Sequence, residues 1–184
     1  MLSAYQLYDL SGHYLNNPLR PANVDDKQKL ELIISRVVKV AQKIPVVFPA
    51  HPRTQKNLNV IAGSADVGAY LQVRPQAQQS LSNLLIIPPL GYRDMLNLEM
   101  NAFFVITDSG GIQVETTVLG IPCLTVMDYP VWHITHKEGT NTLVGSDCAG
   151  LEGEVGKIKT DRKGKRPALW DGQTAERIIE IMAA

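Results

Sequence analysis

The stretch FFVITDSGGIQVETTVLGIPCLTVM, residues 103–127, decides the fold. It begins with an apolar run, passes through a serine and two glycines into a segment of helical length, and returns to a second apolar run after Gly120. Short continuous apolar runs are typical of strands that are buried on both faces of a parallel sheet. Two parallel strands need a crossover between them, so we predict one strand–helix–strand unit here.

The same alternation extends to both sides of this unit. We predict further strands at residues 45–49, 83–89 and 141–145, and helices at residues 24–44, 54–62, 92–102 and 172–184. Asp25 and Asp26 suit the N-cap and first turn of the first helix. Strands that alternate with helices of this length predict an α/β fold, a doubly wound parallel sheet of the Rossmann-like kind. Residues 63–80 are irregular and carry no prediction.

Length and charge limit the classes of protein. A chain of 184 residues suits one domain, so we expect a single domain over residues 1–184, with residues 1–18 as an atypical leader or edge segment. The chain has 18 Lys and Arg against 18 Asp and Glu, which argues against nucleic acid or an anionic membrane as a partner. Its start lacks the features of a signal peptide, so we expect a cytoplasmic protein. Cys123 and Cys148 form no metal-binding or disulfide pattern.

The turn TDSGG is the first candidate site. Ligands of open parallel sheets bind beyond the carboxyl ends of the strands, close to the helices that follow. Ser109 can cap the helix, and Gly110 and Gly111 allow a ligand to approach the backbone N–H groups, which together favour an anion. Glu115 follows within two turns, and a carboxylate can accept hydrogen bonds from the two hydroxyls of a ribose. A capped helix with a solvated Glu115 is an equally good interpretation of these residues alone.

The segment HPRT is the second candidate, because it directly follows the strand predicted at residues 45–49. His51 and Arg53 could contact a phosphate there, since arginine presents a planar fork of donors. In the alternative, their role is structural, with His51 bonded to the loop and Arg53 paired with a carboxylate. His133 and His136 follow another predicted strand, but no third ligand lies near them, so we expect no metal site.

Several motifs together resemble the C-terminal half of the non-hydrolysing UDP-N-acetylglucosamine 2-epimerases. They are LRPANVDD, PVVFPAHPRT, PLGYRDM, VITDSGGIQVETTVLGIPCLTV, EGTNTLVGSD and LWDGQTAERI, in the family's order from Leu19 onward. The resemblance implies one of the two Rossmann-like halves of a glycosyltransferase-B-like fold, with the active site between the halves. Family enzymes interconvert UDP-GlcNAc and UDP-ManNAc by elimination and re-addition of UDP, without a metal or a nicotinamide cofactor.

The resemblance also implies roles for individual residues. The diphosphate turn corresponds to Ser109, Gly110 and Gly111, the ribose carboxylate to Glu115, and the surroundings of the uracil to Leu90 and Met95. Arg20 matches the arginine of a His-Arg pair, but Leu19 stands where the family has the catalytic histidine. Leucine can neither transfer a proton nor donate a hydrogen bond, so we expect no catalytic residue in this chain. Met127 and Trp132 replace two arginines that would assist the leaving diphosphate.

The resemblance places the acidic residues that act as acid and base in the family's N-terminal half. We therefore expect a domain that binds UDP or a UDP-N-acetylhexosamine and is inactive alone, with a separate N-terminal half or a second copy of the chain as partner. A binding module without chemistry is the first alternative. The donor-binding half of a glycosyltransferase is the second, and the EGTN and LWDG motifs disfavour it.

Overall fold

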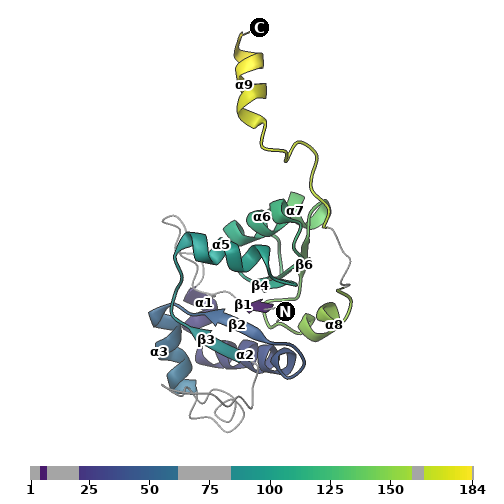
Figure 1. The fold of residues 1–184 in the computed structure, drawn as a ribbon. Coiled ribbons are helices and arrows are strands. Elements are labelled where there is room, and N and C mark those ends of the chain that lie inside the picture. Colours follow the sequence, from purple (N-terminus) through teal and green to yellow (C-terminus); the bar gives the residue numbers. More distant parts are fainter. Residues whose placement is uncertain (1–4, 8–20, 62–83, 159–163, 184) are drawn as a thin grey trace.

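A computed structural model of the chain describes residues 5–7, 21–61, 84–158 and 164–183 (Figure 1). Within these residues, six strands form one entirely parallel sheet in the order β3-β2-β1-β4-β5-β6. The strands are β1 (Tyr5–Leu7), β2 (Val46–Pro49), β3 (Leu84–Ile87), β4 (Val105–Thr107), β5 (Cys123–Thr125) and β6 (Asn141–Leu143). The chain runs outward from β1 to β3, returns to β4 and runs outward again, so the switch point lies between β1 and β4. The predicted doubly wound α/β sheet is confirmed.

The position of β1 corrects one expectation. Residues 1–18 were expected to be a leader or an edge segment, yet Tyr5–Leu7 lies in the middle of the sheet, paired with β2 on one side and β4 on the other. Only three residues form this strand, too few for an apolar pattern to stand out in the sequence. The remaining residues up to Arg20 lie outside the described part of the chain.

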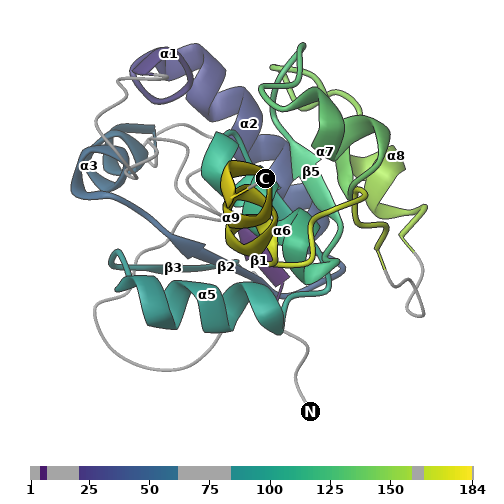
Figure 2. The same cartoon turned by 90° about the horizontal axis from the view of Figure 1, so that it is seen from above.

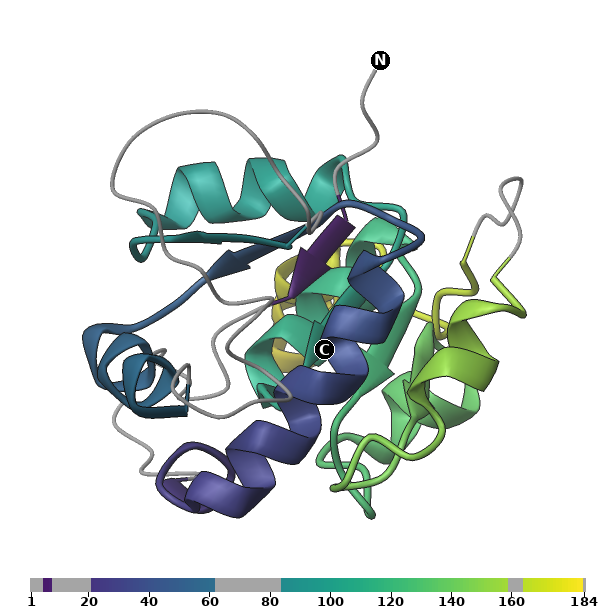
Figure 3. The same cartoon turned by 90° about the horizontal axis from the view of Figure 1, so that it is seen from below.

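Helices cover both faces of the sheet (Figures 1 and 3). On one face lie α2 (Lys27–Ala41), α3 (Pro52–Ile61) and α8 (Leu151–Val155), and on the other lie α5 (Tyr92–Met100), α6 (Gly110–Leu119) and α7 (His133–Lys137). The short α1 (Pro21–Val24) precedes α2, and α9 (Thr174–Ala183) ends the described chain. The sequence predicted the longer helices, whereas α1, α7 and α8 were not predicted because four or five residues are too few to show helical periodicity.

The core forms where α2 packs on the sheet. Asp26 caps α2: its Oδ1 accepts hydrogen bonds from the backbone N–H groups of Gln28 at 3.0 Å and Lys29 at 3.1 Å. A cap at Asp25 or Asp26 was predicted from the sequence. The apolar face of α2 is buried along its length and meets Phe48 of β2 and Ile106 of β4 in one cluster. Fully burying an aliphatic side chain of this size contributes about 1.5 to 3 kcal/mol. This cluster therefore fixes the centre of the sheet.

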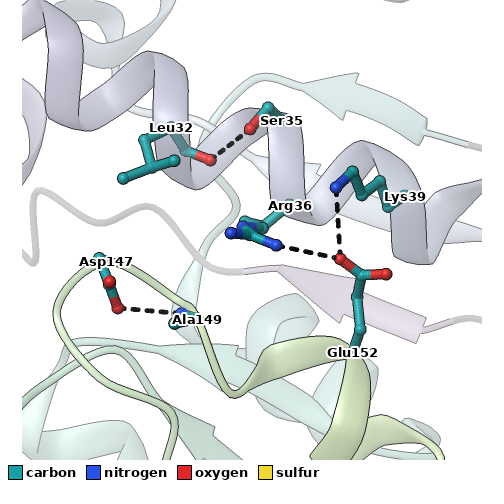
Figure 4. Close-up of polar contacts among 7 residues, drawn as sticks. All are labelled: Leu32, Ser35, Arg36, Lys39, Asp147, Ala149 and Glu152. Atoms are coloured by element: carbon teal, nitrogen blue, oxygen red, sulfur yellow. Dashed lines mark hydrogen bonds and ion pairs between the residues drawn. The ribbon is translucent and has the colours of Figure 1, made fainter.

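Polar contacts join α8 to the outer surface of α2 (Figure 4). Glu152 Oε1 lies 3.4 Å from Arg36 Nη1 and 3.6 Å from Lys39 Nζ. These side chains are partly exposed, and pairs of this kind contribute only about 0 to 1 kcal/mol each. The apolar Leu151, which is fully buried in the α2 cluster, is therefore the main anchor of α8.

The last helix stands apart from the sheet. Figure 1 shows α9 beyond the rest of the chain, at the end of an extended segment. None of its residues is buried, although four apolar side chains recur along it: Ile178, Ile179, Ile181 and Met182. None of the helices in the described ranges is long and apolar enough to cross a bilayer.

Candidate functional site

The turn between β4 and α6 lies at the carboxyl edge of the sheet, as predicted. Ser109 occupies the N-cap in an extended conformation, with φ −81° and ψ 126°, and α6 begins at Gly110. The Ser109 side chain makes no capping hydrogen bond, although the sequence suggested that it would. The first N–H groups of an α-helix have no acceptor within the helix, and the dipole adds positive potential there. An anion can therefore meet the Ser109 hydroxyl and the glycine N–H groups together.

Two hydrogen bonds shape this turn. The Ser109 N–H donates to Thr107 Oγ1 at 3.0 Å, which bends the chain sharply after β4. The buried Asn23 of α1 donates from its Nδ2 to Asp108 Oδ2 at 2.9 Å. This bond ties the start of the α1–α2 segment to the turn at the switch point. Sequence reasoning assigned no role to Asn23 or Asp108, although both fall inside motifs that it quoted.

The loop after β5 closes on the same turn. A Cβ atom built on Gly110 would lie 3.3 Å from Trp132 Nε1 and 3.3 Å from Val131 Cγ1, so glycine permits this close approach. Trp132 remains about half exposed, and its indole N–H is a donor next to the turn. Met127, by contrast, is buried, and its Sδ atom lies 3.5 Å from Gln113 Nε2. Of these two residues, which the resemblance matches to family arginines, only Trp132 is thus exposed beside the turn.

A loop behind α6 holds the helix in place. The ideal Cβ position at Gly139 lies 2.5 Å from the Thr135 carbonyl oxygen and 2.7 Å from Thr117 Cγ2, so no other residue fits there without movement. Asn141 continues this contact, with its Nδ2 donating to Thr135 Oγ1 at 2.6 Å and to the Gln113 carbonyl oxygen at 3.3 Å. The EGTN motif is therefore the support of α6.

Glu115 lies on α6, half-buried, and faces a second carboxyl group on α5. Glu99 is completely buried, and in the described part of the chain neither of its oxygens accepts a hydrogen bond from an N–H or hydroxyl group. Burial, followed by the nearby charge of Glu115, raises the pKa of Glu99 to about 8. Burial also raises the pKa of Glu115, while a hydrogen bond from Glu99 opposes that rise. Burial therefore favours the protonated form of both carboxyl groups, and Glu99 is the more deeply buried of the two.

Sequence reasoning missed Glu99, although a signal was present. Glu99 lies four residues after Met95, on the stripe that packs towards α6, where an apolar side chain is expected. A carboxyl group on an apolar stripe needs a partner, and only the fold shows that the partner is Glu115.

Leu90 and Met95, the two residues expected near the uracil, have different surroundings. Leu90 is partly exposed in the loop after β3, at the carboxyl edge. Met95 packs between α5 and α6 against a small cluster that contains Val105 and Ile112. Arg20 and Leu19 lie outside the described residues.

The HPRT segment follows β2 at the same edge, and its contacts are those of the structural alternative. Arg53 Nη2 lies 2.6 Å from Asp25 Oδ2, and the Arg53 backbone N–H donates to His51 Nδ1 at 3.3 Å. These bonds join the start of α3 to the α1–α2 corner. In the described ranges no group of three His, Cys, Asp or Glu side chains is arranged to hold a metal ion.

Comparison with known proteins identifies the family of the chain. The family model described as UDP-N-acetylglucosamine 2-epimerase matches residues 19–183. The chain belongs to this family. The family resemblance inferred from the motifs is confirmed.

Individual relatives show how much of the family's length is present. The chain is 32% identical over 163 residues to a UDP-N-acetylglucosamine 2-epimerase homolog of Methanococcus maripaludis, covering 89% of this chain and 42% of that protein. It is 33% identical over 177 residues to a UDP-2,3-diacetamido-2,3-dideoxy-D-glucuronate 2-epimerase of Pseudomonas aeruginosa, covering 94% of this chain and 44% of that protein. The chain thus spans less than half of the length of these relatives.

A solved structure supports the fold of this half. The crystal structure of the Methanocaldococcus jannaschii UDP-GlcNAc 2-epimerase, in complex with UDP-GlcNAc and UDP, superimposes with a TM-score of 0.71 at 30% identity. The match covers 99% of this chain and 46% of that one.

Proposed function

We propose that this chain binds UDP and UDP-N-acetylhexosamines at the β4–α6 turn, as the nucleotide-binding half of a UDP-N-acetylglucosamine 2-epimerase. The diphosphate would accept hydrogen bonds from the Ser109 hydroxyl and from the N–H groups of Gly110 and Gly111. The ribose hydroxyls would donate to the Glu115 carboxylate. The observation that carries the proposal is the uncapped glycine turn at the switch point of the sheet, with an acceptor carboxylate on the same helix.

We further propose that the chain does not epimerise its ligand alone. Epimerisation at C2 needs a base that removes a proton from carbon and an acid on the opposite face, and such groups typically contribute about 10² to 10⁴-fold each. The described site offers hydrogen-bond donors and one ribose acceptor, and Leu19 occupies the position of the family histidine. Closure of a second domain would be needed to align the missing groups and to exclude water.

The exposed apolar side chains support a partner half. On α9, Ile181 and Met182 are 77% and 82% exposed, and Tyr129 in the loop beside the site is 83% exposed. Contiguous exposed apolar side chains, such as those along α9, often mark interaction surfaces. The proposed partner is an N-terminal half of the epimerase fold, and a homodimer is the alternative.

A binding module without chemistry is the second candidate function, favoured by Leu19. The identity of the bound sugar also needs a test. The Pseudomonas aeruginosa relative is named as an epimerase of a UDP-diacetamido-glucuronate and not of UDP-GlcNAc.

Calorimetry with UDP tests the binding site. Glu115→Ala should weaken UDP binding by about 1.5 to 3 kcal/mol, because hydrogen bonds to a charged group are lost. Ser109→Ala should cost less, since it removes one neutral hydroxyl. Glu152→Gln on the opposite face of the sheet is the control and should bind as the parent does. An unchanged affinity of Glu115→Ala would remove Glu115 from the site.

Incubation of the pure chain with UDP-GlcNAc, followed by NMR, tests the absence of activity. We expect no UDP-ManNAc beyond a trace. Turnover above about 1 s⁻¹, which is in the ordinary range of enzymes, would show that the chain carries the catalytic groups itself.

A further inference from the structure

We infer that Glu99 is a positioning residue for Glu115: it acts as a buried carboxylic acid that donates a hydrogen bond to the Glu115 carboxylate and fixes the orientation in which that carboxylate meets a ribose. The ribose part of this inference rests on the proposed function. The hydrogen-bonded pair itself rests on the arrangement of α5 and α6 alone.

The burial of Glu99 is the first observation. Its side chain is fully buried, and both of its oxygens lack a donor in the part of the chain that the structure describes. A buried carboxylate without a donor is strongly disfavoured, so the group takes up a proton instead. Once protonated, Glu99 has a hydrogen to donate and needs an acceptor.

The place of Glu115 supplies that acceptor. The helices α5 and α6 pack side by side above the sheet (Figure 2), and the Glu99 and Glu115 carboxyl groups interact across this contact. Glu115 is less buried than Glu99, so it retains its negative charge more easily. One oxygen of Glu115 is then engaged by Glu99, and its remaining lone pairs are free for the two ribose hydroxyls.

The groups around Glu99 are compatible with a single shared proton. The ionisable neighbour that acts on Glu99 is Glu115 of α6, and Glu99 in turn acts on the buried thiol of Cys123 in β5. Burial raises the pKa of Cys123 to about 12, so this thiol stays neutral in the working range of pH. No cation among these neighbours stabilises an ionised Glu99. When the pH rises through the pKa of Glu99, near 8, the donor is lost and two like charges face each other.

Two variants separate positioning from packing. In Glu99→Gln the amide N–H₂ still donates to Glu115 but cannot ionise, whereas Glu99→Met has a similar length and no donor. At pH 7 we expect Glu99→Gln to bind UDP as the parent does and Glu99→Met to bind about threefold to tenfold more weakly, the value of one hydrogen bond. At pH 9 the parent should fall towards the affinity of Glu99→Met, while Glu99→Gln should keep its affinity. Protonation of the UDP phosphates changes the measured affinity of all three proteins equally, so it cancels in the ratios of their affinities.

A measurement without UDP tests the pair independently. Carbon-13 NMR of labelled glutamate carboxyl groups should show Glu115 titrating at lower pH in Glu99→Gln than in Glu99→Met, because only the first supplies a donor to the charged form. Identical titration of Glu115 in the two variants would overturn the inference, whether or not UDP binds. Equal UDP affinities of the two variants at both pH values would overturn it as well. If Glu115 titrates differently in the variants but the parent fails to bind UDP, the pair stands and the proposed function falls.

Discussion

The turns that follow β4 and β2 occupy the same edge of the sheet, and each leads into a helix, yet their polar groups have different surroundings. At the β4–α6 turn, Ser109 leaves the helix N-terminus without a side-chain cap, and α6 carries the half-buried Glu115 next to the fully buried Glu99 of α5. At the β2–α3 turn, Arg53 is already paired with Asp25 at the surface. Under the proposed function, a place at the carboxyl edge is therefore not sufficient for a ligand site. The local partners decide whether donors are left for a ligand.

The buried pair should give the largest effect, on the pH dependence of stability. The pKa of Glu99 is about 8 in the folded chain and 4.5 in a model peptide, so the folded state holds more protons between these values. The free energy of unfolding therefore falls as the pH rises from about 5 through 8. Each unit of difference between the folded and unfolded pKa changes the free energy of unfolding by about 1.4 kcal/mol, so we expect a total loss of a few kcal/mol. Denaturant titrations at pH 5 and pH 8.5 should show this loss in the parent but not in Glu99→Gln. Parallel losses in the two proteins would contradict the assignment.

The support behind α6 should give the next largest effect. Gly139→Ala places a methyl group within 2.5 Å of the Thr135 carbonyl oxygen, a backbone atom that cannot move away easily. Overpacking of this kind typically costs about 1 to 3 kcal/mol, and we expect the upper end. Gly153→Ala is the matched control, because nothing lies within 4 Å of its ideal Cβ position on α8. Equal melting temperatures of the two variants would show that the EGTN loop does not hold α6.

Gly110→Ala tests the close contacts at the turn itself. The new methyl group would lie 3.3 Å from Trp132 Nε1 and Val131 Cγ1, so the loop after β5 must shift. We expect UDP to bind about tenfold more weakly, or about 1.4 kcal/mol, with a much smaller change in stability. Calorimetry measures the affinity, and the Gly153→Ala variant again serves as control. Undiminished binding would mean that the ligand does not approach this glycine.

Arg53→Ala should give the smallest effect. The pair with Asp25 is exposed, and exposed pairs contribute about 0 to 1 kcal/mol. We expect a change in the free energy of unfolding within this range and no change in UDP affinity. A loss of UDP affinity comparable to that of Glu115→Ala would assign Arg53 to a phosphate and abolish the distinction between the two turns.

The sequence predicted the parts of the fold that depend on local pattern. The apolar runs on both sides of Ser109, together with Gly110 and Gly111, indicated a strand, a turn and a helix in that order, and the structure has them. The Asp26 cap was likewise predicted, because capping needs only residues that are close in sequence.

The parts that the sequence did not predict depend on contacts between distant segments. The central place of Tyr5–Leu7 is set by pairing with β2 and β4, which no pattern of three residues reveals. The partnership of Glu99 with Glu115 depends on how α5 packs on α6. The helix at residues 172–184 was predicted, but its sequence does not show what its apolar side chains pack against.

A nitrogen–proton correlation spectrum of the labelled chain, recorded during titration with UDP, tests the central claim most directly. The backbone N–H groups of Gly110 and Gly111 are the proposed donors to the diphosphate, and those of His51 and Arg53 belong to the turn that is already occupied by its own contacts. The account predicts saturable shifts of the two glycine resonances and of Ser109, with those of His51 and Arg53 nearly unmoved. Shifts centred on His51 and Arg53, with the glycines unaffected, would contradict it.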